Sequence, residues 1–190
     1  MGYAISWIAF KDKTSAQVAE LLSLAQSGDF EEIPRGMFSG TKPDKGWYVV
    51  VINKYGHKFV STRSLRRVSV NGDVIAAAIE EHVMFSSTEA WTDGNLVWRL
   101  THKGETGPNN LQEQGSLPEQ YLPIKQRLFA AQRQEDQAEP EVDHIFNIPL
   151  ELAEAIVGFK HDKAYEKNFE ILKPIASDGL LSRLFRRANR

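Results

Sequence analysis

The sequence predicts an α+β protein in which a mostly antiparallel sheet is covered by helices and followed by a helical C-terminal extension. Two observations predict this fold. Runs of aromatic and β-branched residues recur between residues 3 and 102, and the last two are separated by Asp93-Gly94, a strong signal for a two-residue hairpin. Apolar residues with helical spacing follow the first run and return in the C-terminal third. Strands joined by short turns pair antiparallel, and the helices then cover the sheet.

Residues 3–10 are expected to form a buried strand, because they are rich in aromatic and β-branched side chains. A helix should follow, since Thr14 stands where an N-cap belongs and Gly28 can end the helix. The apolar residues of this helix recur at helical spacing and are Val18, Leu21, Leu22 and Ala25.

Residues 46–53 give the strongest strand signal of the chain. They show no clean alternation of polar and apolar residues, which predicts burial on both faces, as in a central strand. The preceding residues 30–45 are rich in Gly, Pro and charge and are expected to form a loop. After Tyr55-Gly56, a second short strand is expected at 58–61.

The middle third predicts strands at 73–85, 88–92 and 95–102. If Asp93-Gly94 is a two-residue turn, Trp91 faces Leu96 and Glu89 faces Trp98 across the hairpin. Alternation then places one set of large apolar residues on a common core face: Trp91, Leu96, Trp98 and Leu100. The opposite face would carry Thr88, Ala90, Val97, Arg99 and Thr101.

The C-terminal third predicts helices. Ser116-Leu117-Pro118-Glu119 has the form of a capping box, and the apolar stripe after it continues to about Arg133. Three further helices are expected at 149–159, 164–173 and 180–190. The expected organisation is therefore an α+β domain over 1–133, an acidic linker over 134–146, and a helical segment over 147–190 that docks on the first domain.

The composition excludes several classes of protein. The chain has 23 Lys+Arg, 25 Asp+Glu and no Cys, which argues against a general nucleic-acid coat and removes disulfides, thiolate metal sites and cysteine nucleophiles. No signal peptide is recognisable, and no apolar run approaches the roughly 20 residues of a transmembrane segment. A cytoplasmic location is expected.

Catalytic motifs are missing from the sequence. It has no nucleophile elbow, phosphate-binding loop or dinucleotide fingerprint, and its five histidines show no metal-binding spacing. We therefore expect no cofactor and no metal. The best catalytic candidates are Glu81, Glu89 and His102, which share the tryptophan-bearing face if residues 73–85 form an unbroken strand. They could line a pocket, or lie where the sheet meets water.

Charged residues are segregated along the chain, which favours a binding function. A basic stretch, 54–67, contains Lys54, Lys58, Arg63, Arg66 and Arg67 and no acidic residue. An acidic stretch contains Glu135, Asp136, Glu139, Glu141 and Asp143. The predicted helix at 180–190 is amphipathic, and its polar side carries Arg183, Arg186, Arg187 and Arg190. It could pack on its own domain, dock on a partner or mediate homo-oligomers.

The function we expect from the sequence is that of a non-enzymatic cytosolic binding protein that acts by protein–protein contact. It could be a bacterial inhibitor or immunity-type protein that occludes a toxin or enzyme, because segregated charge speeds and orients association with a charged partner. One alternative is a small hydrolase or transferase that uses Glu81, Glu89 and His102. A second, less favoured alternative is a nucleic-acid-binding protein that uses residues 54–67.

Overall fold

The computed structural model describes residues 2–107, 109–137 and 142–175, and their strands form one nine-stranded antiparallel sheet. The strands are β1 (Ala4–Lys11), β2 (Leu24–Glu31), β3 (Phe38–Thr41), β4 (Trp47–Ile52), β5 (Asp73–Glu80), β6 (Phe85–Thr92), β7 (Asn95–Lys103), β8 (Leu111–Gly115) and β9 (Phe169–Pro174). Their order across the sheet is β2-β9-β3-β4-β1-β5-β6-β7-β8.

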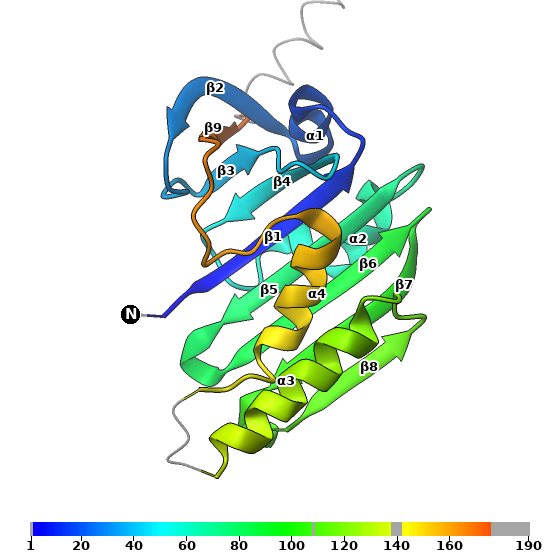
Figure 1. Cartoon of the computed structure of the whole chain (residues 1–190). Coiled ribbons are helices and arrows are strands. Elements are labelled where there is room, and N and C mark those ends of the chain that lie inside the picture. The colour runs from blue at the N-terminus through cyan, green and yellow to red at the C-terminus, as the bar shows by residue number, and fades with distance from the viewer. Residues whose placement is uncertain (1, 108, 138–141, 176–190) are drawn as a thin grey trace, which may run out of the picture.

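Four α-helices of the described residues cover the sheet (Figure 1), as the α+β prediction requires. They are α1 (Ser15–Leu22), α2 (Thr62–Val68), α3 (Tyr121–Glu135) and α4 (Asn147–Val157). Three short 3-10 helices are η1 (Lys58–Val60), η2 (Glu81–Val83) and η3 (Gly104–Thr106). Helices α3 and α4 pack on one face, and α1 and α2 on the other, so the sheet separates two hydrophobic clusters.

The strongest strand prediction, at residues 46–53, corresponds to the central strand β4. All six residues of β4 are buried, as predicted from the lack of alternation in this run, and β4 pairs with β1 on one side and β3 on the other. Alternate residues of β1 enter the two clusters: Trp7 lies under α4, whereas Ile8 lies under α1 and α2.

The first helix is shorter than predicted. It ends at Leu22, because Ser23 adopts a left-handed conformation with φ of 55° and caps the helix. Residues 24–31, of which 24–28 were expected to be helical, form the edge strand β2 instead. The predicted loop at 30–45 contains the buried strand β3. The predicted strand at 58–61 is also wrong, because η1 and then α2 occupy this region.

The β6–β7 hairpin contains a register shift that changes the predicted faces. Trp91 lies opposite Leu96, as predicted, but Glu89 lies opposite Arg99 rather than Trp98. The irregularity falls between Ala90 and Trp91 and reverses the alternation beyond it. The predicted single core face is therefore wrong. Trp91 and Leu96 pack in the cluster beneath α1 and α2, whereas Trp98 and Leu100 pack beneath α3 and α4.

The C-terminal region is only partly helical. The predicted helix at 149–159 corresponds to α4, but the predicted helix at 164–173 is wrong. Residues 169–174 form β9, which inserts between β2 and β3 and pairs with both. The predicted helix at 180–190 lies outside the described residues.

Candidate functional site: a basic groove beside helix α2

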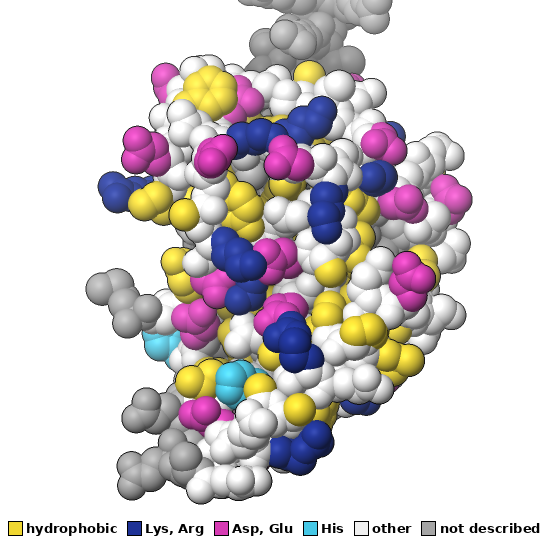
Figure 2. Space-filling view, viewed as in Figure 1, with side chains coloured by type: hydrophobic (Ala, Val, Ile, Leu, Met, Phe, Trp, Pro, Cys, Tyr) yellow, Lys and Arg dark blue, Asp and Glu magenta, His cyan; other side chains and the backbone are white. Residues whose placement is uncertain are grey.

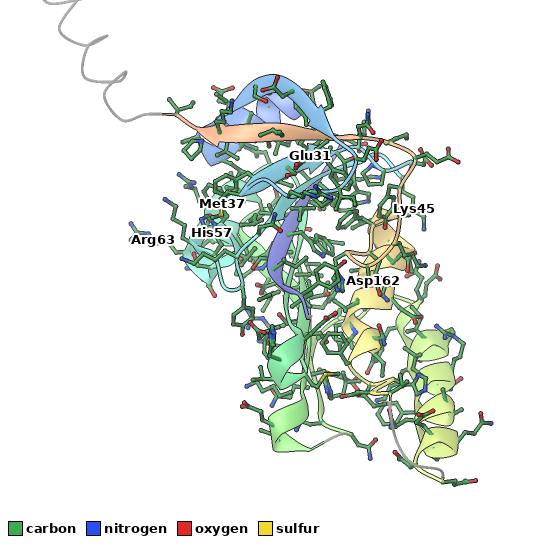
Figure 3. The ribbon with its side chains drawn as sticks, turned by 90° about the vertical axis from the view of Figure 1, so that its left-hand side faces the viewer. Glu31, Met37, Lys45, His57, Arg63 and Asp162 are labelled. Atoms are coloured by element: carbon green, nitrogen blue, oxygen red, sulfur yellow. The ribbon has the colours of Figure 1, made fainter. Side chains whose placement is uncertain are left out.

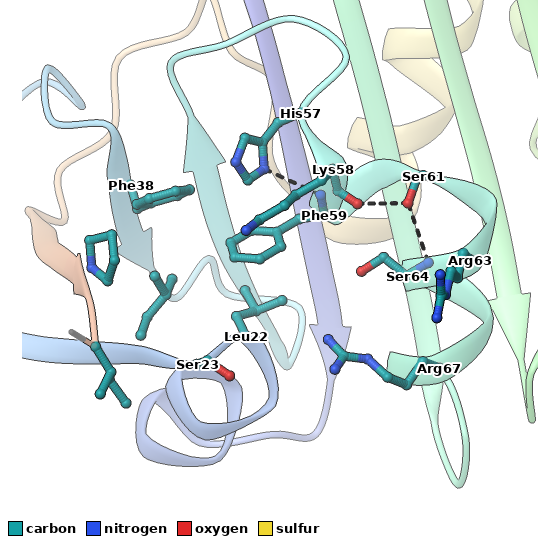
Figure 4. A pocket seen from close by; sticks show the side chains of 13 residues that line it. Leu22, Ser23, Phe38, His57, Lys58, Phe59, Ser61, Arg63, Ser64 and Arg67 are labelled. Carbon is teal, nitrogen blue, oxygen red and sulfur yellow. Dashed lines mark hydrogen bonds between the residues drawn. The ribbon is translucent and has the colours of Figure 1, made fainter. Parts of the chain in front are cut away.

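A groove of about 740 Å³ lies next to η1 and α2. Figure 4 shows that its walls come from segments far apart in the sequence: the end of α1, strand β3, and the turn that carries η1 and α2. Pro174 and Ile175, at the end of β9, close one side. Figure 3 places His57 and Arg63 of this region on the side of the sheet opposite Asp162.

Two side-chain caps hold the η1–α2 segment in shape. The Nδ1 atom of His57 accepts a hydrogen bond from the backbone N–H of Phe59 at 3.2 Å and so caps η1. Ser61 caps α2, because its hydroxyl accepts from the N–H of Ser64 and donates to the carbonyl of Lys58 at 2.7 Å. These bonds fix a tight turn between η1 and α2. They explain why residues 58–61, which the sequence predicts as a short strand, fold instead as a 3-10 helix followed by the cap of α2.

The floor of the groove is apolar. Phe38 and Phe59 lie there with their ring centroids 5.5 Å apart, joined by Leu22 and Leu24. The two phenyl rings are only 4% and 8% exposed. They therefore leave little open ring face on which a nucleotide base could stack. Exposed apolar surface of the groove comes from Ile175, which is 50% exposed.

The rim of the groove is cationic. Lys58, Arg63 and Arg67 line it, and none of the described lining residues is acidic. Within the part of the chain that the structure describes, these three side chains form no ion pair; Lys58 only places its Nζ 5.8 Å from the centre of the Phe59 ring. Lys54 and Arg66, the other predicted members of the basic stretch, are exposed but lie outside the groove.

The pKa of His57 is lowered by burial and by the positive charges at this site. Burial lowers the pKa from 6.5, and the charges of Lys58 and Lys54 lower it further. His57 is therefore a neutral acceptor near pH 7, which is the state that its cap on Phe59 requires.

The three described acids of the acidic stretch all make contacts with other residues of the fold. Asp143 accepts a hydrogen bond from Nε2 of the buried His102 at 2.9 Å and another from the backbone of Phe146. Asp136 accepts from Gln132 at 2.9 Å, and Glu135 lies 3.8 Å from His144. Glu139 and Glu141 lie outside the described residues, as do Arg183, Arg186 and Arg187 of the predicted C-terminal patch.

The three candidate catalytic residues do not converge. Strand β5 ends at Glu80, so Glu81 lies in η2, where it accepts from the backbone N–H of Tyr3. Glu89 pairs with Arg99, at 2.9 Å to Nε. His102 lies opposite Ser86, three residues from Glu89 on the same ladder, and therefore projects from the other face of the sheet. The premise that they share one face is wrong.

Charge is distributed differently over the opposite face. Figure 2 shows basic and acidic side chains intermixed over α3 and α4. Several are paired, including Lys125 with Glu113 at 2.6 Å and Lys163 with Glu154 at 2.5 Å. No described helix is long and apolar enough to cross a membrane, and no described cluster of His, Asp and Glu has the arrangement of a metal site.

No protein-family model, curated protein or solved structure matches the chain. The site is therefore defined by its own geometry: an apolar floor beside three cations that form no ion pair within the described residues. The sequence predicted the cations, because they fall in one stretch without acids. It gave no sign of the floor, since Leu22, Phe38 and Ile175 meet there only through tertiary contacts.

Proposed function

We propose that the protein is a non-enzymatic, cytosolic binding protein whose basic groove receives an acidic segment of a partner protein. The finer version of this proposal is an inhibitor or immunity-type protein, in which the captured segment belongs to a toxin or enzyme that is thereby occluded. The observation that carries the proposal is that a large groove with an apolar floor has three cations on its rim that form no ion pair among the residues the structure describes.

The unpaired cations support an anionic partner. Lys and Arg on a folded surface are commonly balanced by nearby acids, and here no acid faces Lys58, Arg63 or Arg67 within the described residues. Carboxylates brought by a partner would form charge-assisted hydrogen bonds with these side chains. The same positive field would speed association at low salt.

The floor supports a peptide segment rather than a nucleic acid. A nucleic-acid strand bound in such a groove would need exposed rings for base stacking, and both phenyl rings of the floor are buried. A segment that carries a Leu or Phe beside its acidic residues would place the apolar side chain against Ile175, which lines the groove and is 50% exposed, and its carboxylates against the rim. A volume of about 740 Å³ accommodates one large side chain with its flanking backbone.

The test is a binding titration with two fluorescent probes: a heptapeptide that alternates Glu with Leu and Phe, and a twelve-nucleotide deoxythymidine strand. Fluorescence anisotropy gives the Kd of each. The groove variant is Lys58→Glu/Arg63→Glu/Arg67→Glu. The matched control is Arg35→Glu/Lys42→Glu/Arg133→Glu, which makes the same change in net charge at exposed cations that form no ion pair in the described structure.

We expect the peptide to bind, and the groove variant to weaken its binding by about tenfold or more, because three charge-assisted contacts become repulsive. The control variant should keep most of the affinity. Equal losses in both variants would show general electrostatic attraction and reject the groove. If the deoxythymidine strand bound more tightly than the peptide, and the groove variant lost this binding, the partner would be a nucleic acid rather than a protein.

A further inference from the structure

A second cavity, of about 540 Å³, lies near the other end of β9. It is formed by the loop between α4 and β9, by residues 32–34 after β2, and by Tyr3 at the start of the chain. In Figure 3 the loop residue Asp162 lies on the α4 side of the sheet, away from the basic groove. The cavity is therefore separate from the groove of the proposed function, and its chemistry is the opposite.

One ring nitrogen of a buried histidine in the wall of this cavity has no hydrogen-bond partner among the described residues. The side chain of His161 is 2% exposed, and its Nε2 atom lies 3.4 Å from a carboxylate oxygen of Glu81. Glu81 is itself held in place by the backbone N–H of Tyr3 at 2.8 Å. The Nδ1 atom of His161 is buried and has no partner among the described residues. Because buried polar atoms are nearly always satisfied, this atom points to a missing donor.

The protonation state of His161 makes Nδ1 an acceptor. Burial lowers the pKa of His161 from 6.5, although Asp162 and Glu81 partly oppose the shift. The neutral ring carries one proton, and the contact with the Glu81 carboxylate places it on Nε2. Nδ1 then presents a lone pair and can only accept. The group that completes this site must bring an N–H or O–H.

The charged side chains around the cavity leave it negative, which favours a cationic ligand. Glu32 and Glu166 line it, and neither forms an ion pair within the described residues. The nearby cations are already matched: Lys160 lies 2.7 Å from Asp162, and Lys163 lies 2.5 Å from Glu154. The two free carboxylates therefore leave the mouth of the cavity negative.

Aromatic rings supply the walls. Phe159 and Tyr165 are stacked with their centroids 5.1 Å apart, and Tyr3 packs edge to face on His161 at 4.9 Å. Aromatic faces attract cations, and they attract them more strongly where water is excluded. A ligand that reaches the shielded Nδ1 atom would require the ring of Tyr3, which packs on His161 and is 45% exposed, to turn aside.

We propose that this cavity binds an organic cation that carries N–H groups, namely a primary ammonium or a guanidinium. One N–H donates to Nδ1 of His161, Glu32 and Glu166 balance the charge, and the rings of Tyr3 and Tyr165 cover the alkyl part. The same chemistry is found in a free amine and in a Lys or Arg side chain of a partner. This inference does not depend on the partner of the basic groove.

The test uses the full chain, labelled with ¹⁵N, and three probes followed by NMR. Agmatine represents a free amine, N-acetyl-arginine amide represents an arginine side chain, and tetramethylammonium is a cation without N–H groups. We expect agmatine to shift the ring nitrogen signals of His161 in a saturable manner. Tetramethylammonium should bind about tenfold more weakly, because it cannot satisfy the buried acceptor.

The matched variants are Glu32→Gln/Glu166→Gln and, as control, Glu20→Gln/Glu119→Gln, which removes two exposed acids elsewhere that form no ion pair in the described structure. The first should weaken agmatine binding by about fivefold, and the control should leave it unchanged. Tight binding of N-acetyl-arginine amide would support a partner side chain, and tight binding of agmatine alone would support a free amine. Unmoved His161 signals, or equal binding of tetramethylammonium, would overturn the proposal.

Discussion

Helices α3 and α4 use their charges differently from the η1–α2 segment. On α3, Lys125 pairs with Glu113 and Arg127 pairs with Glu151 of α4, so these charges connect one element to the next. In the basic stretch 54–67, five cations form no ion pair within the described residues. Charges of the first kind are balanced within the fold, whereas charges of the second kind have no counter-charge among the described residues. Four experiments can break or sharpen this distinction.

The largest effect should come from the packing beneath α4. Ile148 is 0% exposed and belongs to the cluster between α4 and the sheet. Ile148→Ala should lower the free energy of unfolding by about 2–5 kcal/mol, because it removes buried methyl groups and leaves a cavity. Urea denaturation followed by circular dichroism measures the change. Leu122→Ala on α3, where the side chain is 60% exposed, is the control and should cost far less. A small loss at Ile148 would mean that α4 does not anchor this face.

The sequence predicts this face better than it predicts the groove. Residues 46–53 and 149–159 carry local patterns strong enough to identify a buried strand and an amphipathic helix. Strand β2 escapes prediction because it is a mostly exposed edge strand with little apolar pattern, and β9 resembles a helix in its composition. The shift between Ala90 and Trp91 leaves no local trace, yet it reverses two faces. The groove's cations are visible as a charge run, but its floor exists only in three dimensions.

A second experiment tests an acid that sequence reasoning assigned to recognition. Asp143→Ala should lower the free energy of unfolding by about 1–3 kcal/mol, because buried His102 then loses the acceptor for its ring N–H. The control is Glu119→Ala, at an exposed acid without an ion pair in the described structure. Equal stability of the two variants would show that the contact between Asp143 and His102 does not stabilise the fold, and it would favour a role for Asp143 in recognition.

The pH dependence gives the Asp143 contact an independent signature. Burial alone would raise the pKa of Asp143, but hydrogen bonds from His102 and from the backbone of Phe146 lower it overall from 3.8. A carboxyl group with a lowered folded-state pKa contributes full stability above its ordinary pKa. That contribution is lost as the pH falls through the lowered value. The stability difference between Asp143→Ala and the wild type should therefore shrink below about pH 4.

Paired and unpaired cations can be compared directly by the smaller changes that their removal makes in the free energy of unfolding. Arg127→Ala removes an exposed partner of Glu151 and should cost about 0.2–1 kcal/mol. Arg67→Ala removes a cation whose described neighbours in the groove include Arg63 and Lys58 but no acid, so its effect should lie within about 0.5 kcal/mol of zero and tend toward stabilisation. Urea denaturation of both variants at low and high salt provides the comparison. A larger loss at Arg67 than at Arg127 would show that the groove cations contribute to folding.

The smallest effect is a shift in two histidine pKa values when salt is added. Burial is the largest cause of a lowered pKa in both His57 and His161. The neighbouring charges act in different directions. Lys58 and Lys54 lower the pKa of His57 further, whereas at His161 the raising effect of Asp162 and Glu81 exceeds the lowering effect of Lys160. Screening by salt should therefore raise the pKa of His57 toward 6.5, while the pKa of His161 stays constant or falls.

An NMR titration of the histidine ring signals at low and high salt measures both values in one sample. Each histidine is neutral in the folded state at a pH where the unfolded chain is protonated, so stability should also decline as the pH falls below about 6.5. Salt should reduce the His57 part of this decline, because it brings the folded-state pKa closer to the unfolded one. An anion bound on the groove rim would act on His57 in the same direction as salt, and it would leave His161 unchanged. If salt moved both values upward together, the two regions would share one electrostatic environment, and the distinction between them would fail.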